Sequence, residues 1–148
     1  MRAVVQRVTS ASVSVENEVT AQIGIGLVVL LGVERGDTEE DLAFMAGKLP
    51  YLRIFEDLAG KSNLDVMEVG GSILLVSQFT LCGDARHGRR PGYTDAAAPA
   101  EAQALYEACA ARLAERVPVQ TGVFRAEMQV SLVNDGPFPI LLDSRRRF

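Results

Sequence analysis

The chain has 148 residues, of which 48% are hydrophobic and 23% are charged, and its formal net charge is −4 at pH 7. This length predicts one domain whose core needs no disulfide or metal, and the acidic balance excludes a general basic surface for long nucleic acid. Cys82 and Cys109 lack metal-ligand spacing and His87 is the only histidine, so a histidine-rich metal site is excluded and both thiols are expected to stay reduced, without a chemical role.

The N-terminal region has the pattern of three strands. Residues 2–15 are expected to be extended, because serine and apolar residues alternate strictly from 10 to 15. A turn at 16–18 leads to a second strand at 19–23, and the apolar run 27–31 predicts a buried third strand. No apolar run reaches the length of a membrane span and no signal peptide precedes the first strand, so we expect a cytoplasmic protein without membrane association.

The first helix is expected to follow Asp37, which is a suitable N-cap with Glu40 as its capping partner. Its apolar face recurs at helical spacing and comprises Leu42, Met45, Ala46 and Leu49. Pro50 is expected to end or kink this helix. Residues 53–55 then predict a short strand, and residues 57–63 a turn.

A Gly-Gly pair at 70–71 precedes the apolar run 73–76, which predicts a fully buried, central strand. Directly after it come Ser77, Gln78, Phe79 and Thr80, two hydroxyls, an amide and an aromatic ring at the end of the strand. Two interpretations are open: these residues form a site held by the sheet, or they cap its edge through local hydrogen bonds.

Residues 82–99 hold several glycines, prolines and charges, so we expect a long loop that serves function. Positive charge is concentrated in this loop and at the C-terminus, in Arg86, Arg89, Arg90 and Arg145 to Arg147. The loop arginines fit phosphate contacts and a solvated loop equally well, whereas the terminal run is expected to be a frayed tail.

A second helix is expected at 100–117, with one apolar face formed by Leu105, Cys109, Leu113 and Val117. Strands are predicted at 119–122, 129–134 and 140–142. The elements together predict a single α/β domain spanning residues 1–148, with mostly antiparallel strands in two layers and two helices packed on one side.

The chemistry open to residues 77–80 is limited by the absence of an evident base. His87 lies in a Gly- and Arg-rich loop with no orienting acid, which disfavours a Ser-His-Asp arrangement with Ser77 or Thr80. The backbone N–H groups of residues 78–80 could instead bind a carbonyl oxygen as negative charge develops on it, at about 3 to 4 kcal/mol each. Donors of this kind suit ester hydrolysis.

The segments SQFTL at 77–81 and SLVNDGP at 131–137 together resemble the D-aminoacyl-tRNA deacylase family. The resemblance begins at Gln6-Arg7-Val8 and covers nearly the whole chain. It implies hydrolysis of the ester between a D-amino acid and the terminal ribose of tRNA, without a metal or organic cofactor, as chiral proofreading in translation. The candidate catalytic residues are Ser77, Gln78, Phe79 and Thr80, and the neighbouring 2′-OH of the RNA is expected to assist.

The resemblance also implies a homodimer in which each site is shared between subunits. The Gly136-Pro137 bond would be cis and would enter the partner's site as a wall that rejects L-amino acids, with Asn134 beside it and Arg7 bracing it through nearby carbonyls. Read from the residues alone, Gly136-Pro137 is an ordinary turn and Arg7 a surface charge of a strand. Such a wall cannot exclude glycine, so glycine mischarged on tRNA(Ala) is a second expected substrate.

The chain departs from the family pattern after the wall, where Phe138 and Pro139 stand in place of a small aliphatic residue and a threonine. Pro139 removes a backbone N–H, so this segment is expected not to pair fully within a sheet. Ser62 and the pair Gly92-Tyr93 also differ, which bears on substrate breadth. The alternatives are a catalytically silent module that binds tRNA 3′ ends, and a small-molecule esterase that uses Thr80 or Ser77.

Overall fold

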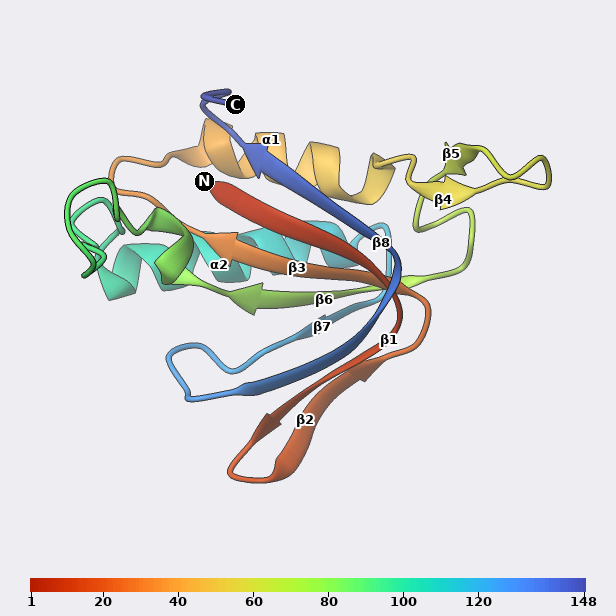
Figure 1. Cartoon of the computed structure of the whole chain (residues 1–148), viewed down its shortest axis with the longest axis horizontal. Coiled ribbons are helices and arrows are strands. Elements are labelled where there is room, and N and C mark those ends of the chain that lie inside the picture. Colours follow the sequence, from red (N-terminus) through yellow and green to blue (C-terminus); the bar gives the residue numbers. More distant parts are fainter.

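A computed structural model describes all residues from 1 to 148 and contains one main sheet (Figure 1). Its strands are β1 (Arg2–Val15), β2 (Glu18–Ile23), β3 (Gly26–Gly32), β6 (Ser72–Ser77), β7 (Val119–Thr121) and β8 (Gln129–Asp143). The order is β2-β1-β3-β6-β7, and β8 also pairs with β1. The first half of β1 pairs with β3 and its second half pairs with β2. The strand β8 pairs with β1 along most of the length of β1. The strand β1 therefore links the two ends of a strongly bent sheet.

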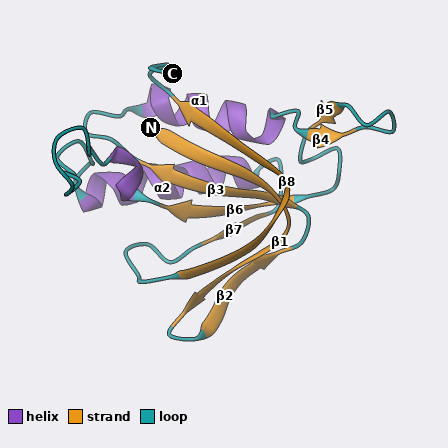
Figure 2. Cartoon of the chain, in the orientation of Figure 1, coloured by secondary structure: helices purple, strands orange, loops and turns teal.

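The sheet is mixed, so the expected mostly antiparallel arrangement is correct only in part. All pairings of β1 are antiparallel, but β6 runs parallel to both β3 and β7. Parallel neighbours need long crossover connections, and here each crossover contains one helix. These helices are α1 (Glu39–Lys48) and α2 (Pro99–Ala114), and both lie on one side of the sheet, as predicted (Figure 2).

The strand β6 is central, as its apolar run predicted, and the four residues Ile73 to Val76 are at most 1% exposed. Ile73 and Leu75 belong to the core cluster under the helices, whereas Leu74 and Val76 belong to a second cluster with β1 and β2. Burial on both faces explains why the run does not alternate with polar residues. This packing holds the C-terminal end of β6 in a fixed position.

The N-cap of α1 is Thr38, and the prediction of Asp37 was wrong by one residue. The Thr38 hydroxyl accepts a hydrogen bond from Glu40 N–H, and the Asp41 carboxylate accepts one from Thr38 N–H at 2.8 Å. The Asp37 side chain is instead fully buried, 2.7 Å from the N-terminal ammonium group of Met1. The Asp37 carboxylate therefore binds the chain terminus, and the next residue, Thr38, caps the helix.

The remaining boundaries differ modestly from the predictions. The helix α1 ends at Lys48, before a 3-10 turn that contains Pro50 (Leu49–Tyr51). The short strand expected at 53–55 is β4 (Phe55–Glu56), which forms a hairpin with β5 (Ser62–Leu64). In α2 the buried residues are Tyr106, Cys109 and Leu113, so Tyr106 takes the core position assigned to Leu105.

The segments predicted as two C-terminal strands form one strand, β8. It pairs with β1 from Gln129 to Asn134 and again from Pro139 to Asp143, with irregular register between these parts. Pro139 lies opposite Gln6, so the proline is accommodated where pairing resumes. The prediction that this segment cannot pair fully is confirmed for residues 135–138, which have no partner on β1. This interruption leaves Gly136 and Pro137 outside the ladder.

The arginines at the C-terminus do not form a frayed tail, and that prediction was wrong. Arg147 pairs with Glu34 and, at 2.6 Å, with Asp143, while Arg145 lies 2.9 Å from Asp37. The Glu34 hydrogen bonds raise the pKa of Arg147 above its usual range. Burial raises the pKa of Asp143, but hydrogen bonds from Arg147 and from Arg145 N–H outweigh burial and leave it lowered.

A carboxyl group whose pKa is lowered by folding stabilises the protein above its unfolded pKa, and this stability is lost as the pH falls through the folded pKa. Replacing Asp143 with asparagine is therefore expected to lower the free energy of unfolding by about 1–2 kcal/mol at pH 7. It should also reduce the loss of stability on acidification below a pH of about 4. Urea unfolding at pH 7 and pH 3 measures both effects, with the exposed Glu115→Gln as control; an unchanged acid dependence would contradict the assignment.

None of the helices combines the length and the apolar character needed to cross a membrane.

Candidate functional site

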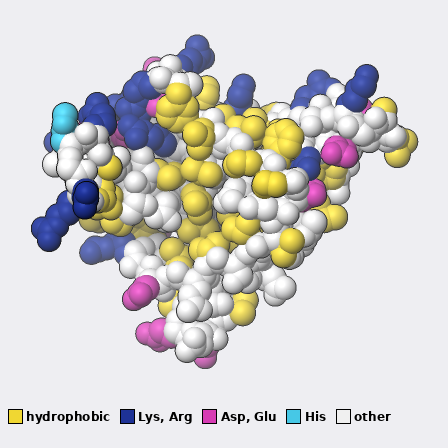
Figure 3. Space-filling model, in the orientation of Figure 1, with side chains coloured by type: hydrophobic (Ala, Val, Ile, Leu, Met, Phe, Trp, Pro, Cys, Tyr) yellow, Lys and Arg dark blue, Asp and Glu magenta, His cyan; other side chains and the backbone are white.

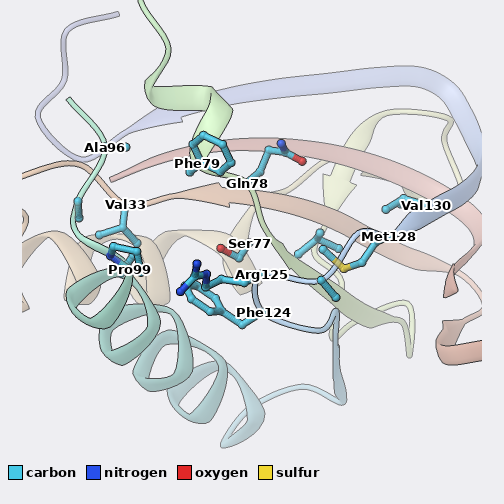
Figure 4. Close-up of a pocket in the computed structure, with 14 residues that line it drawn as sticks. Val33, Ser77, Gln78, Phe79, Ala96, Pro99, Phe124, Arg125, Met128 and Val130 are labelled. Carbon is cyan, nitrogen blue, oxygen red and sulfur yellow. The ribbon is translucent and has the colours of Figure 1, made fainter. Parts of the chain in front are cut away.

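A cavity of about 510 Å³ opens where β6 ends, and Ser77, Gln78 and Phe79 line it (Figure 4). Ser77 is the last residue of β6, and Gln78 leads into a 3-10 turn, Phe79–Cys82. The other residues of the wall come from the segment before α2, the start of α2, the β7–β8 connection and neighbouring strands. They are Val33, Val76, Ala96, Ala97, Pro99, Ala102, Phe124, Arg125, Ala126, Met128 and Val130. Ten of the 14 lining residues are hydrophobic, so a ligand here is largely removed from water.

The backbone at this strand end offers fewer free donors than expected. Gln78 N–H donates to the Leu31 carbonyl at 2.8 Å, so this donor is not available to a substrate and its prediction was wrong. Phe79 and Thr80 begin the 3-10 turn, and the first N–H groups of such a turn have no acceptor within it. Thr80 does not line the cavity, but its hydroxyl accepts a hydrogen bond at 2.5 Å from the Gln78 side-chain amide. This bond orients the Gln78 amide.

Phe79 stands at the cavity with 56% of its surface exposed. Its ring meets Tyr93 of the 83–97 loop edge to face, with 5.1 Å between ring centroids. Asp84 and Gly92 close this loop with two backbone hydrogen bonds of 2.8 Å. An exposed aromatic ring supported in this way is suited to stacking on a planar base.

The loop arginines fall into two groups. Arg86 is bound within the loop by Asp84 at 2.7 Å, and hydrogen bonds from Arg86 hold the pKa of Asp84 well below its usual range. Arg89 and Arg90 are exposed and form no ion pair. Figure 3 shows Lys and Arg side chains gathered at the end of the molecule where this loop and the C-terminus lie. His87 is exposed in the same loop.

Arg7 is buried, and the interpretation as a surface charge was wrong. Its guanidinium donates to the Asp135 carbonyl at 3.0 Å and to the Ile54 carbonyl at 2.5 Å. It also lies 3.1 Å from the Asp135 carboxylate and 5.0 Å from the centre of the Phe138 ring. Arg7 therefore contacts the residues on both sides of the Gly136-Pro137 pair.

The Gly136-Pro137 peptide bond is cis, and Gly136 has a φ of +128°. Asn134 accepts a hydrogen bond of 3.4 Å from the Gln6 side chain. None of these three residues, nor Arg7, lines the cavity. Within one chain the structure thus brings Ser77, Gln78, Phe79 and Thr80 together in one place, and Arg7, Asn134, Gly136 and Pro137 in another.

Sequence reasoning missed the β7–β8 connection, from which Phe124, Arg125 and Met128 reach the cavity. This stretch has no period that marks a strand or helix, and its place at the cavity follows from the parallel pairing of β6 with β7. The only available signal was its position between the QTG segment at 120–122 and the SLVNDGP segment.

Burial disfavours the thiolate form of both cysteines. Burial, together with the nearby Glu34 carboxylate, raises the pKa of Cys82 to about 11, and burial raises that of Cys109 to about 12. Both are free and buried, and Cys109 lies in the core as its place on the apolar face of the second helix predicted. No group of three or more His, Cys, Asp or Glu side chains is arranged to hold a metal ion.

Comparison with known proteins finds similarity over nearly the whole chain. A family model described as D-Tyr-tRNA(Tyr) deacylase matches residues 4–143. Proteins named D-aminoacyl-tRNA deacylase from Anaeromyxobacter dehalogenans and Kosmotoga olearia are 63% and 56% identical to this chain, over the full length of both partners.

Two solved structures share the fold. One described as c-Myc DNA Unwinding Element Binding Protein has a TM-score of 0.92 and 41% identity, and the match covers 97% of this chain and 98% of that one. The other, described as a probable eukaryotic D-amino acid tRNA deacylase, has a TM-score of 0.80 and 19% identity, and the match covers 95% of this chain and 97% of that one. At this identity the likeness shows the fold alone. The resemblance seen in the SQFTL and SLVNDGP segments is confirmed over the whole chain, which belongs to the D-Tyr-tRNA(Tyr) deacylase family.

Proposed function

We propose that the protein hydrolyses the ester between a D-amino acid and the terminal ribose of tRNA, releasing the free D-amino acid and tRNA. The observation that carries this proposal is the placement of Ser77, Gln78 and Phe79 of the SQFTL segment in the wall of one cavity. The full-length relatives named D-aminoacyl-tRNA deacylase support it. Because the substrate takes part in protein synthesis, we expect the enzyme to act in the cytoplasm.

In this proposal the protein positions an ester that is already reactive. The N–H groups of Phe79 and Thr80 stabilise the oxyanion, and Phe79 stacks on the terminal adenine. The 2′-OH of the RNA assists the attacking water, which accounts for a site that contains no histidine or carboxylate. The water adds to the carbonyl carbon, the ester C–O bond breaks, and the ribose oxygen takes the proton.

The first test concerns the Thr80 side chain. Thr80→Ala keeps the backbone donor but removes the hydroxyl, so we expect it to retain most of the deacylation rate, within about tenfold. The small loss arises because the Gln78 amide loses its hydrogen-bond partner. Single-turnover hydrolysis of D-tyrosyl-tRNA measures the rate. A folded variant without activity would assign the chemistry to the hydroxyl and favour an esterase that uses Thr80.

The chiral filter belongs to the same proposal, with Gly136 and Pro137 of one subunit entering the cavity of a partner and excluding an L side chain by clash. These residues do not line the cavity of their own chain, which supports a site shared across a homodimer. Val133 and Leu141 of β8 are more than half exposed, and Figure 3 shows hydrophobic side chains along the sheet face opposite the helices. Such a face suits association with a second copy.

A filter that excludes side chains by clash leaves glycine free to enter, so glycyl-tRNA(Ala) is a second proposed substrate. Rates on D-tyrosyl-tRNA, glycyl-tRNA(Ala) and the ethyl ester of D-tyrosine test the proposal. Hydrolysis of the first two alone supports it, whereas hydrolysis of the ethyl ester would indicate a small-molecule esterase. Binding of all RNA substrates without turnover would favour a silent module that binds tRNA 3′ ends.

A further inference from the structure

Arg125 is the only charged residue in the wall of the cavity. Its side chain is exposed and forms no hydrogen bond or ion pair within the chain, whereas Arg112 and Arg147 pair with Glu39 and Glu34. No carboxylate lines the cavity to neutralise it. The cavity is therefore apolar with one unpaired positive charge, which suits a ligand that carries an anion.

The backbone places this arginine in a conformation that glycine usually adopts. A hydrogen bond from Ala126 N–H to the Val123 carbonyl, at 3.2 Å, closes a turn in which Arg125 has a φ of +63°. Turns with a positive φ at this position favour glycine or asparagine. The preceding residue, Phe124, packs on the buried Tyr106 with 5.9 Å between ring centroids. The turn is thus held firmly, and it directs the guanidinium into the space between Ser77 and Pro99 (Figure 4).

We propose that Arg125 binds the backbone phosphate next to the terminal adenosine of the RNA, an inference that rests on the proposed function. In the aminoacylated end of an RNA, the ester, ribose and adenine are neutral and the α-amino group is neutral or positive. The phosphates are the only anions, and a guanidinium pairs with phosphate through two parallel hydrogen bonds.

The charge also determines the direction in which the substrate lies. A positive α-amino group is repelled by Arg125, so the aminoacyl group lies on the far side of the cavity, where Gln78 and Phe79 stand (Figure 4). The RNA chain then leaves past Arg125. Recognition of a phosphate makes the site one for an aminoacylated nucleotide rather than for a free aminoacyl nucleoside.

A binding experiment tests this without relying on catalysis. The probes are 3′-deoxy-3′-(D-tyrosylamido)adenosine and its 5′-monophosphate, whose amide bond is not hydrolysed. The wild type is expected to bind the phosphorylated probe about tenfold more tightly. Arg125→Gly, which suits the turn and should fold at least as well, is expected to bind both probes equally, and Arg125→Lys to keep part of the preference.

Arg146→Gly is a matched control, because Arg146 is also exposed, unpaired and at a positive φ of 52°, but lies outside the cavity. It is expected to keep the full preference for phosphate. The inference is overturned if the wild type binds both probes equally, or if Arg125→Gly loses the same factor for both. It is also overturned if Arg125→Gly keeps the phosphate preference and loses only inhibition by free D-tyrosine, which would assign Arg125 to the product carboxylate.

Kinetics with the intact substrate separate this inference from the proposed function. For D-tyrosyl-tRNA, Arg125→Gly should raise KM about tenfold, with the change on KM rather than kcat, and lower the slope of log KM against log salt by about 0.7. If the wild type does not hydrolyse D-tyrosyl-tRNA but prefers the phosphorylated probe, the proposed function fails and the phosphate site stands. If it hydrolyses the substrate without that preference, only the phosphate site fails.

Discussion

Replacing Arg7 with leucine is expected to lower the ratio of D- to L-tyrosyl-tRNA hydrolysis by about 100-fold, the scale of effect that a displacement of about 1 Å has in a site. The guanidinium binds the carbonyls of Asp135 and Ile54, and lies on the Phe138 ring. Leucine supplies none of these hydrogen bonds, so the segment that carries Gly136 and Pro137 loses its support. We expect hydrolysis of the L substrate to rise and that of the D substrate to fall.

The same substitution should cost about 3 kcal/mol of stability, because the buried Ile54 carbonyl and the partly buried Asp135 carbonyl lose charge-assisted hydrogen bonds. Urea unfolding establishes that the variant is folded under the assay conditions. Arg116→Leu is a suitable control, since Arg116 is exposed and bonds to the Tyr51 hydroxyl away from the cavity. A folded Arg7→Leu protein with the selectivity of the wild type would show that Arg7 does not position the filter.

Gly136→Ala is expected to reduce hydrolysis of D-tyrosyl-tRNA by about 100-fold. A Cβ at this position would lie 3.0 Å from Phe138 N and 3.4 Å from an Arg7 guanidinium nitrogen, and the φ of +128° is one that L residues rarely adopt. The backbone must therefore move, together with Pro137. Multiple-turnover assays with D-tyrosyl-tRNA and glycyl-tRNA measure the loss, and both substrates should be affected.

Gly70→Ala is a control that introduces backbone strain at a position away from Gly136. Gly70 also has a positive φ, of +65°, but a Cβ there would meet no atom within 4 Å. Both variants should lose about 1–3 kcal/mol of stability, whereas only Gly136→Ala should lose activity. Equal activities of the two variants would mean that Gly136 has no part in the site.

Local patterns in the sequence predicted the elements whose burial follows from their own residues. The run Ile73 to Val76 was predicted as a central buried strand, and the structure buries it on both faces between β3 and β7. The helix α1 was predicted from its apolar spacing for the same reason, because Leu42 and Met45 pack into the core. Patterns of this kind report burial but not the neighbour of a strand.

Features that depend on distant contacts were not predicted. Asp37 and Thr38 are both suitable N-cap residues, and the choice between them depends on the Met1 ammonium group. The parallel pairing of β6 depends on crossovers through α1 and α2, which local composition does not encode. Turn-forming residues at 134–137 divided β8 in the prediction, whereas in the structure one strand continues across them and only its pairing with β1 is interrupted, at 135–138.

The candidate site shows the same division. The residues at 77–80 were proposed because a polar cluster follows a buried strand, and the resemblance supplied Gly136 and Pro137. Arg125 was missed because nothing near it in the sequence marks a site, and only the fold of the β7–β8 connection brings it to the cavity that Ser77 and Pro99 also line. The charge of Arg125 indicates an anionic ligand only because the other residues that line the cavity are uncharged.

The most direct measurement is release of tyrosine from matched D-tyrosyl-tRNA and L-tyrosyl-tRNA by the purified protein in the presence of a metal chelator. We expect rapid loss of the D form alone, at a rate that the chelator does not change. Loss of both forms would mean that Gly136 and Pro137, followed here by Phe138 and Pro139, do not form a working filter. Loss of neither form, with binding intact, would contradict the proposal that this cavity hydrolyses the ester.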